Sequence, residues 1–231
     1  MNPQVVRTSN FSKDAANFIL RLAKQALAER DEFRIALSGG NTPRPVYSEV
    51  ARFGLPWERI IITFGDERCV PPDHEQSNYR MAQETLLGPA AVPGQSVLRM
   101  RGEIDPQIAA QEYQESLDTL AAKGKEQIYR HDLILLGLGE DGHTASLFPE
   151  TSALKEETRR VVANFVPKLQ SWRLTFTFPL INQARHVCFL VNAAKNAELI
   201  ERVVAGDPRY PASRVQPISG ELTWMIGERA A

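Results

Sequence analysis

Residues 132–144 read Asp-Leu-Ile-Leu-Leu-Gly-Leu-Gly-Glu-Asp-Gly-His-Thr, an apolar run that passes directly into a glycine-bearing polar loop. A short apolar run of this kind predicts a strand that is covered on both faces, as the central strands of parallel sheets are. We therefore interpret residues 132–137 as a central strand and expect the other elements to be built outward from it.

Strands and helices alternate along the rest of the chain. Apolar or alternating runs predict further strands at residues 33–37, 59–64, 160–166, 173–178, 186–191 and 221–226. Helical spacing and helix-start signals predict helices at residues 11–30, 43–50, 78–87, 106–122 and 195–205, with Ser12 and Thr42 as N-caps of the first two. This order indicates an α/β fold with a largely parallel sheet flanked by helices.

Three polar segments that contain glycine follow three of these strands, at residues 38–42, 65–71 and 137–146. In parallel α/β sheets, ligands bind beyond the carboxyl ends of the strands. The three segments are therefore expected to converge at one edge of the sheet and to form one site there.

The composition excludes several classes of protein. The chain has 231 residues with 27 basic and 28 acidic side chains, and its formal charge of −1 gives no general attraction to nucleic acid or to an anionic membrane. Cys69 and Cys188 are too few for a disulfide framework or a four-cysteine zinc site. No apolar run approaches the roughly 20 residues that span a bilayer, and no signal peptide is visible. We expect one cytoplasmic domain over residues 1–231.

The first polar segment, Ser38-Gly39-Gly40-Asn41-Thr42-Pro43, combines a tight turn with a helix start. Backbone N–H groups in such a turn and at a helix N-terminus bind phosphate or carboxylate groups. The Gly-Lys-Ser/Thr ending of a P-loop is absent. An ordinary strand-to-helix turn has the same sequence features, so both interpretations stay open on local grounds.

The loop after the central strand contains a literal G-x-G-x-x-G at residues 137–142. A dinucleotide site is disfavoured, because Asp141 would place a carboxylate where a pyrophosphate must lie and Pro149 leaves no room for a long helix. Asp141 and His143 are two residues apart between glycines, so both can face one cavity. A carboxylate beside an imidazole raises the pKa of the imidazole and orients it, which suits a general base. The alternative is a solvated loop histidine.

Further charged residues lie close to the ends of other strands. Arg68 is a candidate for binding a phosphate or stabilising an oxyanion, and Asp66 for an acid, a base or a hydroxyl acceptor. Arg173 and Lys195 are candidates to complete an anion site. Each of these is, taken singly, more often an ordinary surface charge. The four histidines are scattered without metal-ligand spacing, and no G-x-S-x-G of a serine hydrolase is present.

Taken together, these motifs resemble the 6-phosphogluconolactonases of the glucosamine-6-phosphate isomerase/6-phosphogluconolactonase family. The resemblance is carried by four stretches that span most of the chain: residues 38–43, residues 65–71 with Ser77-Asn78, residues 137–149, and residues 173–182 followed by Lys195. It implies a modified Rossmann-like α/β fold with a small additional α/β portion. It also implies hydrolysis of 6-phospho-D-glucono-1,5-lactone to 6-phospho-D-gluconate, a step of the oxidative pentose phosphate pathway, without a metal or an organic cofactor.

The resemblance assigns a role to each candidate residue. His143 would be the general base, with Asp141, Arg68 and Asp66 as the other catalytic residues. The residues expected to bind the substrate phosphate are Ser38, Gly39, Gly40, Thr42, Arg173 and Lys195. The expected partner is a small sugar-phosphate lactone, with no nucleic acid or membrane, and the protein is either a monomer or a homodimer.

The main competing activity is that of the related glucosamine-6-phosphate deaminases, which share the Ser-Gly-Gly and Asp-Gly-His loops. In those enzymes, the loop ends in Glu-Pro and the glutamate partners the catalytic histidine, whereas this chain has Phe148 before Pro149. Because phenylalanine cannot transfer a proton, this difference favours lactone hydrolysis. A dinucleotide-dependent oxidoreductase and a non-catalytic sugar-phosphate sensor are the remaining alternatives.

Overall fold

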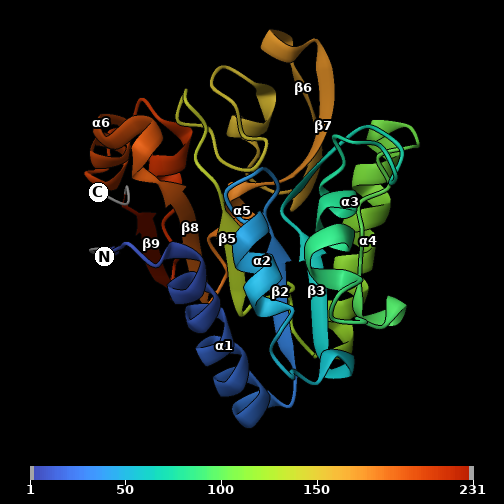
Figure 1. Cartoon of the computed structure of the whole chain (residues 1–231). Helices are drawn as coiled ribbons and strands as arrows, with labels where there is room; N and C mark the ends of the chain where they lie inside the picture. Colours follow the sequence, from blue (N-terminus) through green and yellow to red (C-terminus); the bar gives the residue numbers. More distant parts are fainter. Residues whose placement is uncertain (1–2, 229–231) are drawn as a thin grey trace.

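The centre of the fold is a sheet in which every strand runs parallel to its neighbours (Figure 1). The computed structural model describes residues 3–228, apart from the side chains of residues 193–196. Within that range the sheet has six strands, in the spatial order β1 (Gln4–Thr8), β9 (Glu221–Gly227), β8 (His186–Asn192), β5 (Leu133–Leu136), β2 (Phe33–Leu37) and β3 (Ile60–Phe64). The predicted α/β class with a largely parallel sheet is confirmed.

The direction of winding reverses between β2 and β5. From β2 the chain proceeds to its neighbour β3 on one side, whereas from β5 it proceeds through β8 to β9 on the other. Loops that leave the carboxyl ends of two such strands diverge and open a crevice between them. The loops that follow β2 and β5 are residues 38–43 and 137–146, two of the three polar segments singled out in the sequence.

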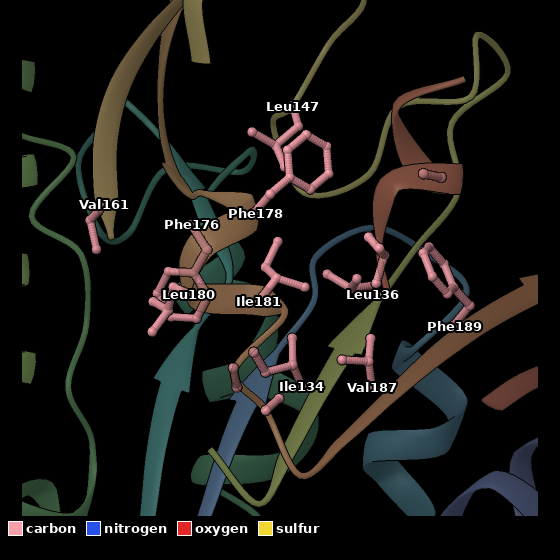
Figure 2. Packing of buried hydrophobic residues seen from close by; sticks show 14 of the residues in the cluster. Ile134, Leu136, Leu147, Val161, Phe176, Phe178, Leu180, Ile181, Val187 and Phe189 are labelled. Carbon is pink, nitrogen blue, oxygen red and sulfur yellow. The ribbon is translucent and has the colours of Figure 1, made fainter. Parts of the chain in front are cut away.

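The two faces of the sheet are covered by different helices, because alternate side chains of each strand point to opposite sides. On β5, Leu133 and Leu135 pack into one buried cluster and Ile134 and Leu136 into another, shown in Figure 2. The cluster of Leu133 includes side chains of α1 (Phe11–Arg30), α2 (Arg44–Val50) and α3 (Asn78–Ala82). The cluster of Ile134 includes side chains of α4 (Pro106–Lys123), α5 (Phe178–Ile181) and α6 (Ala193–Val204).

A small antiparallel sheet projects from the carboxyl edge of the large one (Figure 1). It consists of β4 (Asp66–Arg68), β7 (Ser171–Phe176) and β6 (Val161–Val166), in that order. The chain passes from β3 into β4 through Gly65 alone, whose N–H donates to Leu37 O (3.0 Å) and whose carbonyl accepts from Phe176 N (2.8 Å). The strands that carry Asp66, Arg68 and Arg173 are therefore anchored to the central sheet. The additional portion is antiparallel sheet rather than a second α/β unit.

Several local predictions need correction. Strands β1 and β4 were not predicted, and the predicted helix 78–87 is α3 followed by a π-helical turn at Gln83–Leu87. The predicted N-caps are wrong. The N-cap of α1 is Asn10 rather than Ser12, and the first turn is joined to β1 by Thr8, whose hydroxyl donates to the Asp14 carboxylate. The N-cap of α2 is Pro43 rather than Thr42, since α2 begins at Arg44.

Among the described residues, no helix is both long enough and apolar enough to cross a bilayer.

Candidate active site

A cleft of about 480 Å³ lies at the carboxyl edge of the parallel sheet. Its walls include residues 38–43 after β2, Gly65, Asp66 and Arg68 after β3, and residues 135–141 and 143–146 at and after the end of β5. The predicted convergence of three distant polar segments is therefore confirmed. Nine of the ten predicted site residues line this cleft: Ser38, Gly39, Gly40, Thr42, Asp66, Arg68, Asp141, His143 and Arg173. The tenth is Lys195 in α6, and its side chain lies outside the described residues.

His143 is held from two sides by its own loop. Its Nδ1 lies 2.5 Å from Oδ1 of Asp141, and its ring stacks on Phe148 with centroids 3.8 Å apart and planes inclined by 21°. The contact with an ionised carboxylate favours a proton on Nδ1, which leaves the lone pair of the neutral imidazole on Nε2. This arrangement suits a side chain that accepts a proton through Nε2.

Two glycines make this loop conformation possible. Gly142 has a φ of +76°, in the left-handed region that glycine adopts without strain. At Gly139, an added Cβ would lie 2.1 Å from both Cε1 and Nδ1 of His143, so the imidazole packs directly over the backbone there. Gly139 and Gly142 of the G-x-G-x-x-G pattern thus allow the loop to place the His143 imidazole. No helix begins directly after Gly142, as a dinucleotide site would require.

Asp141 has a second partner that the sequence did not indicate. Nζ of Lys168, in the turn between β6 and β7, lies 3.2 Å from Oδ2 of Asp141. Burial of the Asp141 carboxyl raises its pKa, but the hydrogen bonds and charge of His143 and the contact with Lys168 outweigh this effect, so the pKa lies below its usual value. Asp141 is therefore an ionised carboxylate that bridges an imidazole and an ammonium group. Lys168 escaped prediction because a lysine in a polar turn has no local feature that separates it from a solvated one.

Asp66 links three loops of the site. Its Oδ1 accepts from Nδ2 of Asn78 (3.0 Å) and its Oδ2 accepts from Oγ of Ser146 (2.7 Å), 80 residues further along the chain. Asn78 in turn packs against Gly39, where an added Cβ would lie 1.9 Å from its Oδ1. These contacts fix the positions of the loops after β2, β3 and β5 relative to one another. Asn78 and Ser146 were present in the quoted motifs but were not predicted as site residues.

Glu67 follows Asp66 on β4, so its side chain lies on the opposite face of the strand and points away from the cleft. Its side chain is 2% exposed, and its carboxylate accepts from Oγ of Ser77 and from the backbone N–H groups of Arg68, Asn78 and Tyr79 at 2.7–3.1 Å. Burial raises the pKa of this carboxyl despite these hydrogen bonds. Glu67 therefore holds the start of α3, and with it Asn78, against β4.

Arg68 and Arg173 form a cationic pair in the cleft. They are directly opposite each other in the antiparallel pairing of β4 with β7. Arg68 donates to the carbonyl oxygen of Gln76, and Arg173 donates to Oγ of Ser171 and the carbonyl oxygen of Trp172, so these partners are neutral. In the described part of the chain, neither arginine forms an ion pair. Burial and the nearby charge of Arg68 lower the pKa of Arg173. Like charges opposite each other destabilise a sheet, so the pair indicates a site prepared for an anion.

The Ser38 loop is held by a buried tyrosine. The hydroxyl of Tyr47 accepts from the Ser38 N–H and donates to the Ser38 carbonyl, both at 2.9 Å. The Ser38 amide is therefore already engaged, whereas Gly39, Gly40 and Thr42 of the same loop also line the cleft. Gly40 has a φ of +89°, so the turn requires glycine there.

A metal centre has no support in the described residues, where no three or more His, Cys, Asp or Glu side chains gather closely enough to hold an ion.

Known proteins resemble this chain along most of its length. The family model described as glucosamine-6-phosphate isomerases/6-phosphogluconolactonase matches residues 7–224. A protein of Synechocystis sp. named 6-phosphogluconolactonase is 45% identical over 210 residues, which cover 89% of this chain and 86% of that protein. One named 6-phosphogluconolactonase from a Nostoc species is 37% identical over 93% of this chain and 90% of its own length.

Solved structures give the same result. The crystal structure of 6-phosphogluconolactonase from Thermotoga maritima superposes with a TM-score of 0.87 at 26% identity, covering 97% of this chain and 99% of that one. The structure of the enzyme of the same name from Trypanosoma brucei gives a TM-score of 0.85, also at 26% identity, over 97% and 96% of the two chains. Sequence and structure together establish that the chain belongs to the glucosamine-6-phosphate isomerase/6-phosphogluconolactonase family.

Proposed function

We propose that the protein hydrolyses 6-phospho-D-glucono-1,5-lactone to 6-phospho-D-gluconate, in the oxidative pentose phosphate pathway. The observation that carries the proposal is a single cleft with an Asp141–His143 pair on one wall and the Arg68–Arg173 pair on another. One pair supplies a base and the other receives an anion. The names of the relatives that match most of the chain support the same activity.

The substrate phosphate is proposed to bind at the cationic side of the cleft. Arg173 binds it together with Lys195, and the Ser38 hydroxyl, the backbone of Gly39 and Gly40, and Thr42 complete the site. A guanidinium group matches phosphate oxygens in geometry as well as charge, and the amides of a glycine turn can approach them closely. The phosphate would thus fix one end of the substrate and leave the lactone carbonyl near His143.

The chemical step requires only water as a second reactant. Nε2 of His143 accepts a proton from water while the water oxygen bonds to C1 of the lactone, and the carbonyl π electrons move to the carbonyl oxygen. When the tetrahedral intermediate collapses, the carbonyl re-forms and the bond from C1 to the ring oxygen breaks. The imidazolium then returns its proton to that ring oxygen, which becomes a free hydroxyl group. The new carboxylic acid ionises and releases one proton to solution.

The other polar groups assist this step in the proposal. Asp141 orients the imidazole and stabilises the imidazolium that forms transiently. Arg68 stabilises the negative charge that develops on the carbonyl oxygen, which is where preorganised donors contribute most to catalysis. Asp66 holds a sugar hydroxyl group while it keeps the three loops together.

The decisive experiment measures acid release from freshly prepared 6-phosphogluconolactone, corrected for the spontaneous hydrolysis of the lactone. The proposal requires a rate well above the spontaneous one, and binding of 6-phosphogluconate without acceleration would instead indicate a sensor. Glucosamine 6-phosphate serves as the control substrate. We expect it to release no ammonia, because Phe148 stands before Pro149 where the deaminases of this family have the glutamate that partners their histidine, and phenylalanine cannot transfer a proton.

A further inference from the structure

The turn of the β6–β7 hairpin reaches across the cleft and touches the Asp141–His143 pair. Lys168 donates to one carboxylate oxygen of Asp141 at 3.2 Å, while the other carboxylate oxygen lies 2.5 Å from Nδ1 of His143. The three groups come from two elements that are separate in the fold. The fold, rather than proximity in sequence, therefore brings Lys168 to Asp141. Through this carboxylate, a cation is linked to the proposed base.

The backbone that carries Lys168 is firmly supported. Behind it, β6 and β7 pair over six positions, from Val161 with Phe176 to Val166 with Ser171. The turn itself is a short 3₁₀ segment, Pro167–Leu169, closed by Gln170, whose N–H and side-chain amide both donate to the Pro167 carbonyl at 3.1 and 2.7 Å. The Lys168 side chain is 70% exposed, so its position is set by this turn and by Asp141.

Several other charged or titratable groups line the cleft or adjoin the loop of His143. They are Glu140 on the same loop, Asp66 and Arg68 on β4, Arg173 on β7, and Tyr210, which packs against Gly142. Within the described side chains, Lys168 is the cation in direct contact with Asp141. It is therefore the group best placed to balance the charge beside the imidazole.

We infer that Lys168 is a positioning residue, which holds Asp141 against His143 and offsets the carboxylate charge so that the imidazole stays neutral and able to accept a proton. The carboxylate orients the imidazole, but without a cationic partner it would also stabilise the imidazolium form more strongly and so reduce the share of neutral ring that can accept a proton. The ammonium group opposes this effect without touching the ring. The inference rests on the proposed function, in which neutral His143 takes the proton from water.

The size of the effect follows from the exposed position of Lys168. A unit charge two hydrogen bonds away, in surroundings close to water, moves a titration midpoint by about 0.4 pH unit. Because the side chain is exposed, salt should screen the effect, since the screening length falls from about 10 Å at 0.1 M to about 3 Å at 1 M.

The test is an NMR titration of the His143 imidazole in the full-length protein, with its resonances assigned by comparison with His143→Gln. We expect Lys168→Met to raise the midpoint by about 0.4 pH unit and Lys168→Glu to raise it about twice as far. Lys168→Arg keeps the charge and should titrate like the wild type. Lys155→Met removes an exposed lysine outside the cleft and serves as the matched control. A midpoint that stays unchanged or falls in Lys168→Met overturns the inference.

The pH dependence of kcat gives a second readout. The acid limb of Lys168→Met should move to higher pH by the same amount, so that kcat falls about 2.5-fold on that limb and is unchanged on the alkaline side. A raised KM with an unshifted imidazole midpoint would make Lys168 a substrate ligand and refute the positioning role. If the wild type does not accelerate lactone hydrolysis, the proposed function fails, while the titration of the free protein still decides the role of Lys168.

Discussion

Replacement of Gly139 by alanine tests the geometry of the proposed base without removing any functional group. The added Cβ would lie 2.1 Å from the imidazole of His143, where real Cβ contacts keep at least 3.0 Å. The ring must therefore move by about 1 Å, and a displacement of that size at a catalytic group can lower the rate about 100-fold. The 2.5 Å contact between His143 and Asp141 cannot survive such a shift unchanged.

The fold should tolerate this substitution. Gly139 does not have a positive φ, so alanine adds no backbone strain, and the His143 side chain is 25% exposed and can move toward solvent. We expect kcat for lactone hydrolysis to fall about 100-fold, with a KM close to that of the wild type. The Tm should fall by only a few degrees, since the two contacts at risk are the partly exposed hydrogen bond of His143 to Asp141 and its stacking on Phe148, each worth about 1 kcal/mol.

Gly94→Ala is the matched control, because an added Cβ there meets nothing within 4 Å. It makes the same chemical change at a site outside the cleft and should leave kcat within twofold of the wild type. The reasoning is refuted if Gly139→Ala retains wild-type kcat. It is equally refuted if a crystal structure of that variant shows the imidazole in place and bonded to Asp141 while activity is lost.

Three further predictions address the base, the anion site and the core. His143→Ala should lower kcat by about 10²–10⁴-fold with a smaller change in KM, as steady-state kinetics on fresh lactone will show; an unchanged kcat excludes His143 as the base. Arg173→Ala and Lys195→Ala should mainly raise KM, and a KM that stays constant in both would remove the phosphate from this side of the cleft. Burial lowers the pKa of His131 to about 3, whereas the unfolded chain binds its proton near pH 6.5. The free energy of unfolding should therefore fall by about 1.4 kcal/mol per pH unit as the pH drops from about 6 to 4, and urea unfolding of His131→Gln should lack this component of the slope.

The central strands of the parallel sheet could be predicted because buried strands appear in the sequence as short apolar runs. Residues 33–37 were predicted with both ends correct, and the run of residues 132–137 contains β5. The missed strands lack that signal. β1 is an edge strand with three exposed residues of five, and β4 has only three residues, all of them charged. What defines β4 as a strand is its pairing with β7, which is remote in sequence and invisible to any local pattern.

The candidate site was predictable where its residues follow strands directly. Asp141 and His143 lie in one short loop, so their contact follows from spacing alone. The contacts of Lys168 with Asp141 and of Ser146 with Asp66 join residues 27 and 80 positions apart, and they depend on how the hairpin folds back over the sheet. The capping errors at Ser12 and Thr42 have a different cause. The chain before each helix is held by a side chain within that helix, Asp14 for α1 and Tyr47 for α2, and neither helix has a side-chain cap hydrogen bond.

The connection from β5 to β8 carries a consequence for protein engineering. A single helix usually connects neighbouring parallel strands. In this chain, the connection from β5 to β8 instead contains the His143 loop, the hairpin with Lys168 and the strand with Arg173. The groups assigned to proton transfer, together with Arg173 of the anion site, thus lie on one contiguous segment. A chimera in which the segment between Leu136 and Phe178 is exchanged with that of a related enzyme should therefore receive these groups together. The contacts of this segment with Asp66 and Arg68 must be preserved in such a chimera.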